Sequence, residues 1–298
     1  MMKTELPIQL GLRLHDSENV PFAERLSNVK KQGFSCVHIA LSKIDDLPSN
    51  LEALTPGYAL WLRRQFADAG LSVAVIGNYL NLANPDAADM QGILKKYEAY
   101  ARFSSLLGAG VLGTETGAPN RKYDCTDREA VRSEEAYTLF KNNLKQAVSY
   151  AGKYGITLAI EPVYKHTIWC PARARRLLDE IGSPNLRIIF DPVNLIDPEL
   201  TESRDEVLGE AMDLLSEEIA EIHLKDYILT ENADGSHAMK AVGCGKGCMD
   251  YTEVIRFAVT KKPYIQATLE NTTPDDAEDC RRYIEDIERQ VLKEETKE

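Results

Sequence analysis

Four short apolar segments in the C-terminal half of the chain each run directly into a residue that can bind a metal ion. Thr157–Ile160 is such a segment: it has no helical period, and it follows Gly155, a typical helix stop. The other segments span 186–190, 219–222 and 264–269, and the residues that follow the four segments are Glu161, Asp191, His223 and Glu270. Such runs are typical of strands buried on both faces of a parallel sheet. Because chemistry in parallel α/β folds collects at the C-terminal ends of the strands, the pattern predicts a functional site there.

Strand-like and helix-like segments alternate along the whole chain. They form eight strand–helix units of roughly 30 to 45 residues, the expected size of a βα unit. The spacing predicts an α/β fold, a single (β/α)8 TIM barrel over residues 1–292, followed by a charged tail, residues 293–298, that frays. A doubly wound open sheet is the alternative, but it leaves the even spacing unexplained. The sequence contains neither a glycine-rich dinucleotide fingerprint nor a Walker loop.

The charge of the chain limits its partners. The 298 residues include 47 acidic and 35 basic side chains, for a net charge of −12. This charge argues against nucleic acid and against an anionic membrane surface, and it is also usual for a cytoplasmic protein. Residues 1–7 contain no long apolar run, so we expect neither a signal peptide nor a membrane-spanning segment. The expectation is a cytoplasmic protein with a small-molecule substrate, and a homo-oligomer stays open.

Each residue after a strand also has an ordinary structural interpretation. A lone carboxylate there is usually a helix N-cap or a solvated loop charge, and a lone histidine is usually structural. Closure of a barrel, however, brings adjacent strand ends to one mouth, where three carboxylates repel one another unless a cation neutralises them. We therefore predict that one divalent metal ion is bound by Glu161, Asp191, His223 and Glu270. Three oxygens and one imidazole suit Mn²⁺, Mg²⁺, Co²⁺ or Zn²⁺.

Such a site suits proton abstraction from a carbon next to a carbonyl. A metal ion that holds both oxygens of an α-hydroxy ketone stabilises the enediolate formed when that carbon loses its proton. A carboxylate on each side of the carbon can take the proton and return it. We expect Glu161 and Glu270, facing each other across the mouth, to be these catalytic groups. A ligating carboxylate keeps an oxygen free for this task only if it binds the metal through one oxygen.

Several segments of the second half of the chain resemble a known family. They are Ile160-Glu161-Pro162, 190–194, 222–226, the glycine-rich segment 242–247 and Leu269-Glu270-Asn271. Together they are similar to the xylose isomerase-like TIM barrel family of sugar phosphate isomerases and epimerases. The resemblance implies a divalent ion, commonly Mn²⁺, at the residues matching Glu161, Asp191, His223 and Glu270. In the ketose epimerases of this family, the two glutamates also form the acid–base pair.

The chain departs from the ketohexose epimerases of that family at three positions. Those enzymes carry a second glutamate, an arginine and a histidine where this chain has Thr167, Leu229 and Asn194. The resemblance therefore does not imply their hexose specificity. The related endonucleases need several metal ions and many histidines, whereas this chain has five histidines in all.

Five further side chains are candidates for contacts with a substrate, and each has a structural alternative. They are Arg13, Lys165, His166, Asn194 and Lys225. Lys165 and His166 follow the Glu161 strand and should line the mouth, unless they are surface residues of a loop. Lys225 lies two residues past His223 and should point to the same side of the chain. Arg13, at the end of the first strand, meets either an anionic group or a structural carboxylate.

The site supports three hypotheses about function. The first is a divalent-metal-dependent isomerase or epimerase of a sugar, polyol or keto-sugar that works through a metal-stabilised enediolate. The second is a lyase on the same site, which dehydrates an inosose or eliminates a β-oxygen from an oxidised sugar glycoside. The third is a non-catalytic sugar-binding partner subunit. The long segment Tyr227–Met249, which carries four glycines, is expected to be a loop that forms a lid or a wall of the mouth, or an insertion for subunit contact.

Overall fold

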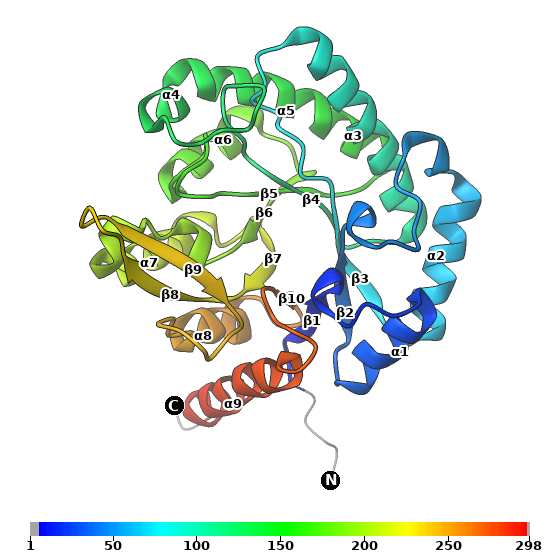
Figure 1. The fold of residues 1–298 in the computed structure, drawn as a ribbon, viewed down its shortest axis with the longest axis vertical. Coiled ribbons are helices and arrows are strands. Elements are labelled where there is room, and N and C mark those ends of the chain that lie inside the picture. The colour runs from blue at the N-terminus through cyan, green and yellow to red at the C-terminus, as the bar shows by residue number, and fades with distance from the viewer. Residues whose placement is uncertain (1–5, 297–298) are drawn as a thin grey trace.

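Eight parallel strands close into a barrel, and helices surround it (Figure 1). The structure, a computed structural model, describes residues 6–296. Residues 1–5 and 297–298 lie outside the described residues. The first of these ranges is part of the segment that led us to expect no signal peptide. The strands are β1 (Gln9–Arg13), β2 (Cys36–Ile39), β3 (Ser72–Gly77), β4 (Val111–Glu115), β5 (Leu158–Glu161), β6 (Leu186–Phe190), β7 (Ile219–Leu224) and β10 (Gln266–Leu269). The barrel closes where β1 pairs with β10. This architecture confirms the predicted (β/α)8 barrel and excludes the open sheet.

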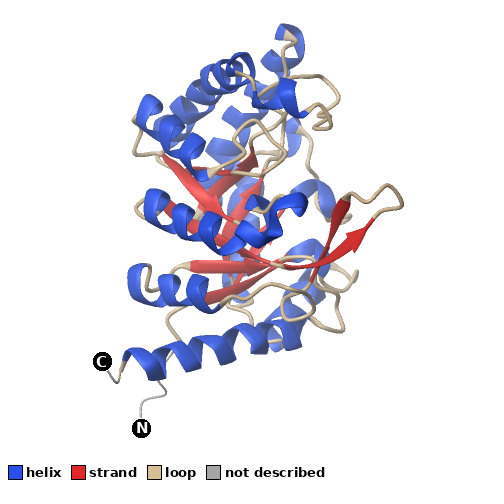
Figure 2. Cartoon of the chain, turned by 90° about the vertical axis from the view of Figure 1, so that its left-hand side faces the viewer, coloured by secondary structure: helices blue, strands red, loops and turns tan. Residues whose placement is uncertain are grey.

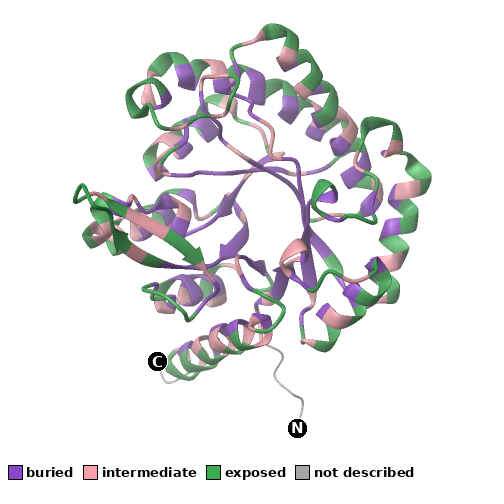
Figure 3. Cartoon of the chain, viewed as in Figure 1, coloured by how far each residue is buried: buried purple, intermediate pink, exposed green. Residues whose placement is uncertain are grey.

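Helices cover the outer face of the barrel. They are α1 (Phe22–Lys31), α2 (Pro56–Asp68), α3 (Ala87–Leu107), α4 (Arg128–Arg132), α5 (Glu134–Tyr154), α6 (Pro171–Ile181), α7 (Arg204–Leu215), α8 (Thr252–Lys261) and α9 (Ala277–Glu295), with short 3-10 helices at 14–16, 41–43, 51–53, 193–195 and 198–203. The glycines Gly108, Gly155 and Gly182 end α3, α5 and α6 in the left-handed conformation that glycine adopts most easily. Figure 3 shows the helices exposed on their outer faces and buried where they meet the barrel.

The strands are buried on both faces. Every residue of β2 and of β5 is buried, because one face packs under the helices and the other fills the barrel. Alternate residues turn inward. Near the C-terminal end of β7 these include Glu221 and His223, which are 1% and 0% exposed. The interior of the barrel at this end is therefore charged and polar, and the strand ends converge on it.

The segment 227–249 differs from the expected glycine-bearing loop. It contains most of an antiparallel hairpin, β8 (Asp226–Glu231) and β9 (His237–Val242), which projects from the barrel in Figure 2. Asp234-Gly235 at the tip is a hairpin turn signal that the loop interpretation overlooked. The base of the segment is fixed, because the carboxylate of Asp226 accepts hydrogen bonds from the backbone N–H groups of Gly245, Gly247 and Met249.

The last helix is longer than the sequence suggested. Helix α9 continues to Glu295, so residues 293–295 are helical where a frayed tail was expected. The reason is a tertiary contact: Arg256 of α8 forms ion pairs of 2.7 Å with both Glu294 and Glu295. No helix within residues 6–296 is long and apolar enough to span a bilayer.

Candidate metal centre and active site

The four predicted ligands come together at the C-terminal mouth of the barrel. Glu161 ends β5, Asp191 follows β6, His223 lies in β7 and Glu270 follows β10. All four are at most 5% exposed. The Nδ1 atom of His223 lies 3.2 Å from Oε2 of Glu161 and 3.5 Å from Oε1 of Glu270. Donor atoms of Glu161, Asp191 and His223 all lie within 4.8 Å of one another, so one ion can reach all three.

A short turn after β6 fixes two of these carboxylates. Residues 193–195 form one turn of 3-10 helix, which brings the backbone N–H of Asn194 to 3.0 Å from Oδ1 of Asp191. The side-chain amide of Asn194 donates a hydrogen bond to Oε1 of Glu161. The predicted substrate contact Asn194 is therefore also a positioning residue, and it leaves Oδ2 of Asp191 and Oε2 of Glu161 to face the centre.

Two cations lie among the carboxylates. The Nζ atom of Lys225 is 2.6 Å from Oδ2 of Asp191 and 3.3 Å from Oε2 of Glu270. Arg13 binds the same oxygen of Glu270 at 3.3 Å and pairs with Asp16 at 2.9 Å. Both sequence-based interpretations of Arg13 therefore describe it in part, because it faces the site and is also held by a structural carboxylate.

The electrostatic environments of the two glutamates differ. Burial, and then the charge of Glu270, raise the pKa of Glu161 to about 8. At Glu270 burial raises the pKa, and positive charge on His223, Lys225 and Arg13 lowers it by more, so that it lies well below its usual value. Because burial lowers the pKa of His223 and keeps its imidazole neutral, we assign the net lowering to Lys225, to the hydrogen bond from His38 and to Arg13. In the metal-free protein Glu270 is therefore ionised, whereas Glu161 holds a proton at neutral pH.

Two residues of the centre, His38 and Tyr79, were not identified from the sequence. The ring of His38, in β2, stacks on that of His223 with centroids 5.1 Å apart, and its Nδ1 lies 3.6 Å from Oε1 of Glu270. The hydroxyl of Tyr79 lies 3.2 Å from Nε2 of His38. Gly77 makes room for this pair, since a Cβ there would lie 2.5 Å from the Tyr79 ring. Burial lowers the pKa of His38 to about 4, so this histidine is neutral.

A fourth carboxyl group lies behind His223. Oε2 of Glu221 is 3.2 Å from Nε2 of His223, and its Oε1 accepts a hydrogen bond of 2.8 Å from the hydroxyl of Thr268. Such outer groups orient a ligand histidine. The period of two along β2 and β7 is the signal that would have found both His38 and Glu221, since each lies two residues from another inward-facing side chain.

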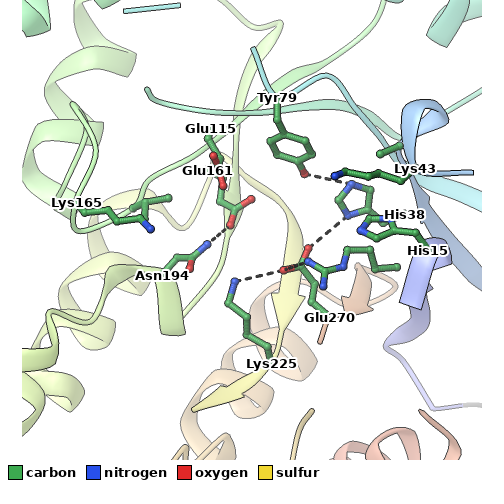
Figure 4. A pocket seen from close by; sticks show the side chains of 13 residues that line it. His15, His38, Lys43, Tyr79, Glu115, Glu161, Lys165, Asn194, Lys225 and Glu270 are labelled. Carbon is green, nitrogen blue, oxygen red and sulfur yellow. Dashed lines mark hydrogen bonds and ion pairs between the residues drawn. The ribbon is translucent and has the colours of Figure 1, made fainter. Parts of the chain in front are cut away.

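A cavity of about 250 Å³ lies above the centre. Its polar lining includes His38, Tyr79, Glu161, Asn194, Lys225 and Glu270 (Figure 4). Figure 4 shows Glu161 and Glu270 reaching toward a common space, with Lys225 below them and a dashed line joining it to Glu270. Lys165 lines its edge, as predicted, whereas His166 lines a neighbouring cavity instead.

The residues present fit a divalent ion. Three carboxylates and a neutral imidazole converge, which is a hard donor set with one nitrogen. Within residues 6–296, both ring nitrogens of His223 are buried without a hydrogen bond, and a carboxylate oxygen lies 3.2 Å from each of them. Buried polar atoms without a partner are uncommon in folded proteins, and ligation removes the deficit.

Two proteins described as epimerases are similar to this chain in sequence. A putative L-ribulose-5-phosphate 3-epimerase of Haemophilus influenzae is 23% identical over 248 residues, which is 82% of this chain and 81% of that protein. The 2-epi-5-epi-valiolone 7-phosphate 2-epimerase of an Actinoplanes species is 34% identical over 143 residues, about half of each chain (47% and 46%). These similarities support a sugar isomerase or epimerase.

A solved structure and a family model agree with the fold. A xylose isomerase-like TIM barrel protein of Mycobacterium smegmatis, solved in complex with magnesium, superposes with a TM-score of 0.68 at 18% identity over 97% of both chains. The family model described as xylose isomerase-like TIM barrel matches residues 26–292. The chain therefore belongs to the xylose isomerase-like TIM barrel family.

Proposed function

We propose that this protein is a divalent-metal-dependent isomerase or epimerase of a sugar, polyol or keto-sugar. The observation that carries the proposal is the pair Glu161 and Glu270. Both are buried, both reach one cavity, and their pKa values are shifted in opposite directions. Two carboxyl groups arranged in this way can remove a proton from one carbon and return one to the substrate.

The chain supplies the ligands and the proton-transfer groups. Glu161, Asp191, His223 and Glu270 hold the ion, with Mn²⁺ as the first choice and Mg²⁺, Co²⁺ or Zn²⁺ as alternatives. When bound, the ion supplies positive charge that stabilises an enediolate. Glu270 takes the proton from the carbon next to the carbonyl, and Glu161, which loses its own proton when the ion binds, takes up a proton from solvent and returns it to the substrate. The ammonium of Lys225, 6% exposed, donates a hydrogen bond to a substrate oxygen as its negative charge develops.

A lyase on the same site is the second candidate, and the pair formed by His38 and Tyr79 favours it. Their contact of 3.2 Å places another proton donor in the cavity, besides the two glutamates. An elimination needs such a donor to protonate the oxygen that leaves from the β-carbon. Both reactions begin with the same proton abstraction, and they differ in the product.

Metal-dependent hydrogen exchange tests the proposal. Metal-free protein is incubated in D₂O with keto-sugars and inososes, with and without Mn²⁺, and deuterium incorporation and products are measured by NMR after removal of the metal. We expect incorporation only with metal, and loss of it in Glu270→Gln. Rearranged products identify an isomerase or epimerase, and dehydrated products identify the lyase. Metal-independent exchange, or undiminished exchange in Glu270→Gln, would refute the proposed mechanism.

A further inference from the structure

A separate cavity lies along helix α1. It measures about 350 Å³, and within the described chain it has no lining residue in common with the cavity at the metal centre. Its lining includes Arg25 and Asn28 of α1 and Gln32 at the end of that helix, which follow the spacing of one helix face. We infer that this cavity binds the phosphate group of a small metabolite, and that the bound anion strengthens metal binding. The second part rests on the proposed function, whereas the first does not.

Arg25 is the strongest indication of a ligand. The residue lines the cavity although it is only 4% exposed. Its guanidinium donates hydrogen bonds to the carbonyl oxygen of Leu14, at 3.4 Å, and to Oδ1 of Asn19, at 2.5 Å. Both acceptors are neutral, and Arg25 forms no ion pair within residues 6–296. Buried charges are normally paired, because an uncompensated one costs free energy. An anion in the cavity supplies the missing negative charge without replacing either hydrogen bond.

A second cation lines the same cavity. Lys31 is exposed, and it too has no ion pair in the part of the chain that the structure describes. The one carboxylate among the described lining residues belongs to Glu18, which is exposed and accepts a hydrogen bond of 3.2 Å from the side-chain amide of Asn28. Two unpaired cations beside one solvated carboxylate leave an excess of positive charge. The cavity therefore favours an anion over a neutral ligand.

The number of cations and the size of the cavity indicate a phosphate ester. A phosphate group carries about two negative charges and several acceptor oxygens, so one group can interact with both Arg25 and Lys31. Arginine is a frequent phosphate ligand in proteins because its planar guanidinium matches the phosphate oxygens. Sites for small molecules measure about 300–1,000 Å³, and this cavity lies near the lower limit of that range. The space left beside a phosphate thus suits a small organic body of a few carbon atoms.

Two segments that position the predicted metal ligand Glu270 also line this cavity. Ser17 lines it and directly follows Asp16, whose carboxylate accepts a hydrogen bond of 2.7 Å from the backbone N–H of Asn271. Pro274, three residues past Asn271, lines it as well. An anion bound here contacts both segments and so stabilises the arrangement that directs Glu270 toward the ion. By linkage, the anion and Mn²⁺ must then raise the affinity for each other by the same factor.

Phosphorus NMR with the metal-free protein in EDTA tests the site. Inorganic phosphate and glycerol 3-phosphate are titrated at constant ionic strength, and we expect saturable line broadening, with the lower Kd for the ester. Arg25→Gln should raise that Kd roughly tenfold or more, the effect of one lost hydrogen bond between charged groups. Lys31→Gln should raise it about threefold, because an exposed charge contributes less. The matched control is Arg64→Gln, an exposed arginine of α2 that pairs with Asp68 at 3.5 Å and should leave the Kd unchanged.

Calorimetric titration of Mn²⁺ with and without glycerol 3-phosphate tests the coupling. The Kd for Mn²⁺ should fall by about fivefold or more in the parent protein but not in Arg25→Gln, which also corrects for Mn²⁺ bound by the ester in solution. An unchanged Kd for Mn²⁺ in the parent protein refutes the coupling.

Other outcomes overturn the site itself. The absence of saturable binding refutes it, and so does equal binding by the parent protein, Arg25→Gln and Lys31→Gln. Displacement of the ester by equimolar chloride would show an adventitious ion only. If Arg25→Gln does not fold, Lys31→Gln, a change at an exposed position, decides the question. If the parent protein binds no Mn²⁺, the proposed function fails, whereas the phosphorus titration still decides the site.

Discussion

Replacing Lys225 by Met should weaken the metal-free protein and strengthen metal binding at the same time. The ammonium lies 2.6 Å from Asp191 and 3.3 Å from Glu270. At an effective dielectric constant of about 20, these contacts correspond to about 6 and 5 kcal/mol of attraction, before the cost of burying the charges. Breaking one side of a buried ion pair destabilises a protein by about 3–5 kcal/mol, and we expect a loss in this range at pH 8.

The same charge should oppose the binding of a metal ion, because the ammonium and the ion share Asp191. Removing it should therefore raise the affinity for Mn²⁺ by at least about tenfold, or about 1.4 kcal/mol. By linkage, the stability deficit of the variant must shrink by that amount when metal is saturating. Turnover should nevertheless fall, since the substrate oxygen loses a donor.

Urea unfolding with EDTA and with saturating Mn²⁺, together with calorimetric titration of Mn²⁺, measures each side of this cycle. The matched control is Lys141→Met, whose partner Glu180 lies on the surface and whose removal should have little effect on any readout. Unchanged or weaker Mn²⁺ binding in Lys225→Met would show that Lys225 does not compete with the ion. An equal stability deficit with and without metal would lead to the same conclusion.

Three further changes test other parts of the structure. In Glu161→Gln, the rate of deuterium exchange into substrate should fall about 10²–10⁴-fold. Glu161 is protonated at pH 7 in the metal-free parent protein, so Mn²⁺ binding should release a proton there but not in the variant. Calorimetry in buffers of different ionisation enthalpy measures this proton release. Burial raises the pKa of Glu288 to about 7, so the folded state holds this proton more tightly than the unfolded state and stability is lost as pH rises from about 4.5 to 7. Glu288→Gln keeps an acceptor for the N–H of Ile8 and should therefore gain up to about 3 kcal/mol over the parent protein between pH 5 and pH 8 in urea unfolding. Gly77→Ala should push Tyr79 aside and lower turnover without changing Mn²⁺ affinity, whereas unchanged turnover would remove Tyr79 from the mechanism.

The barrel and its four central residues could be predicted because both depend on local patterns. Strand ends are marked in the sequence by an apolar run followed by a polar residue, as at Glu161 and Glu270. Closure of the barrel then brings these strand ends to one mouth, without any further signal in the sequence. The prediction found His223 inside β7, but it missed two other residues inside strands. His38 is the third residue of β2 and Glu221 the third of β7, so finding them required the alternation along each strand in addition to the apolar run.

Contacts between segments that are far apart in the chain could not be predicted from the sequence. Asp16, in the turn after β1, accepts a hydrogen bond of 2.7 Å from the backbone N–H of Asn271, whose φ of 56° turns the chain directly after Glu270. The two residues are 255 positions apart in the chain. No spacing rule connects them, yet this contact fixes the direction of a predicted ligand. Arg13 forms ion pairs with both Asp16 and Glu270 because the same two segments lie side by side.

The charges at the centre suit the proposed divalent ion better than an ion of another valence. Glu161, Asp191 and Glu270 carry three negative charges when ionised, and Lys225 contributes one positive charge in direct contact. The imidazole of His223 is neutral, and Arg13 is balanced by Asp16. Burial and its acidic neighbours raise the pKa of Glu221 well above its usual value, so this carboxyl group adds no charge. Two negative charges are left in a buried space, and a doubly charged cation balances them. A monovalent ion would leave a net charge buried, and without any ion the centre must take up a proton, as the raised pKa of Glu161 indicates.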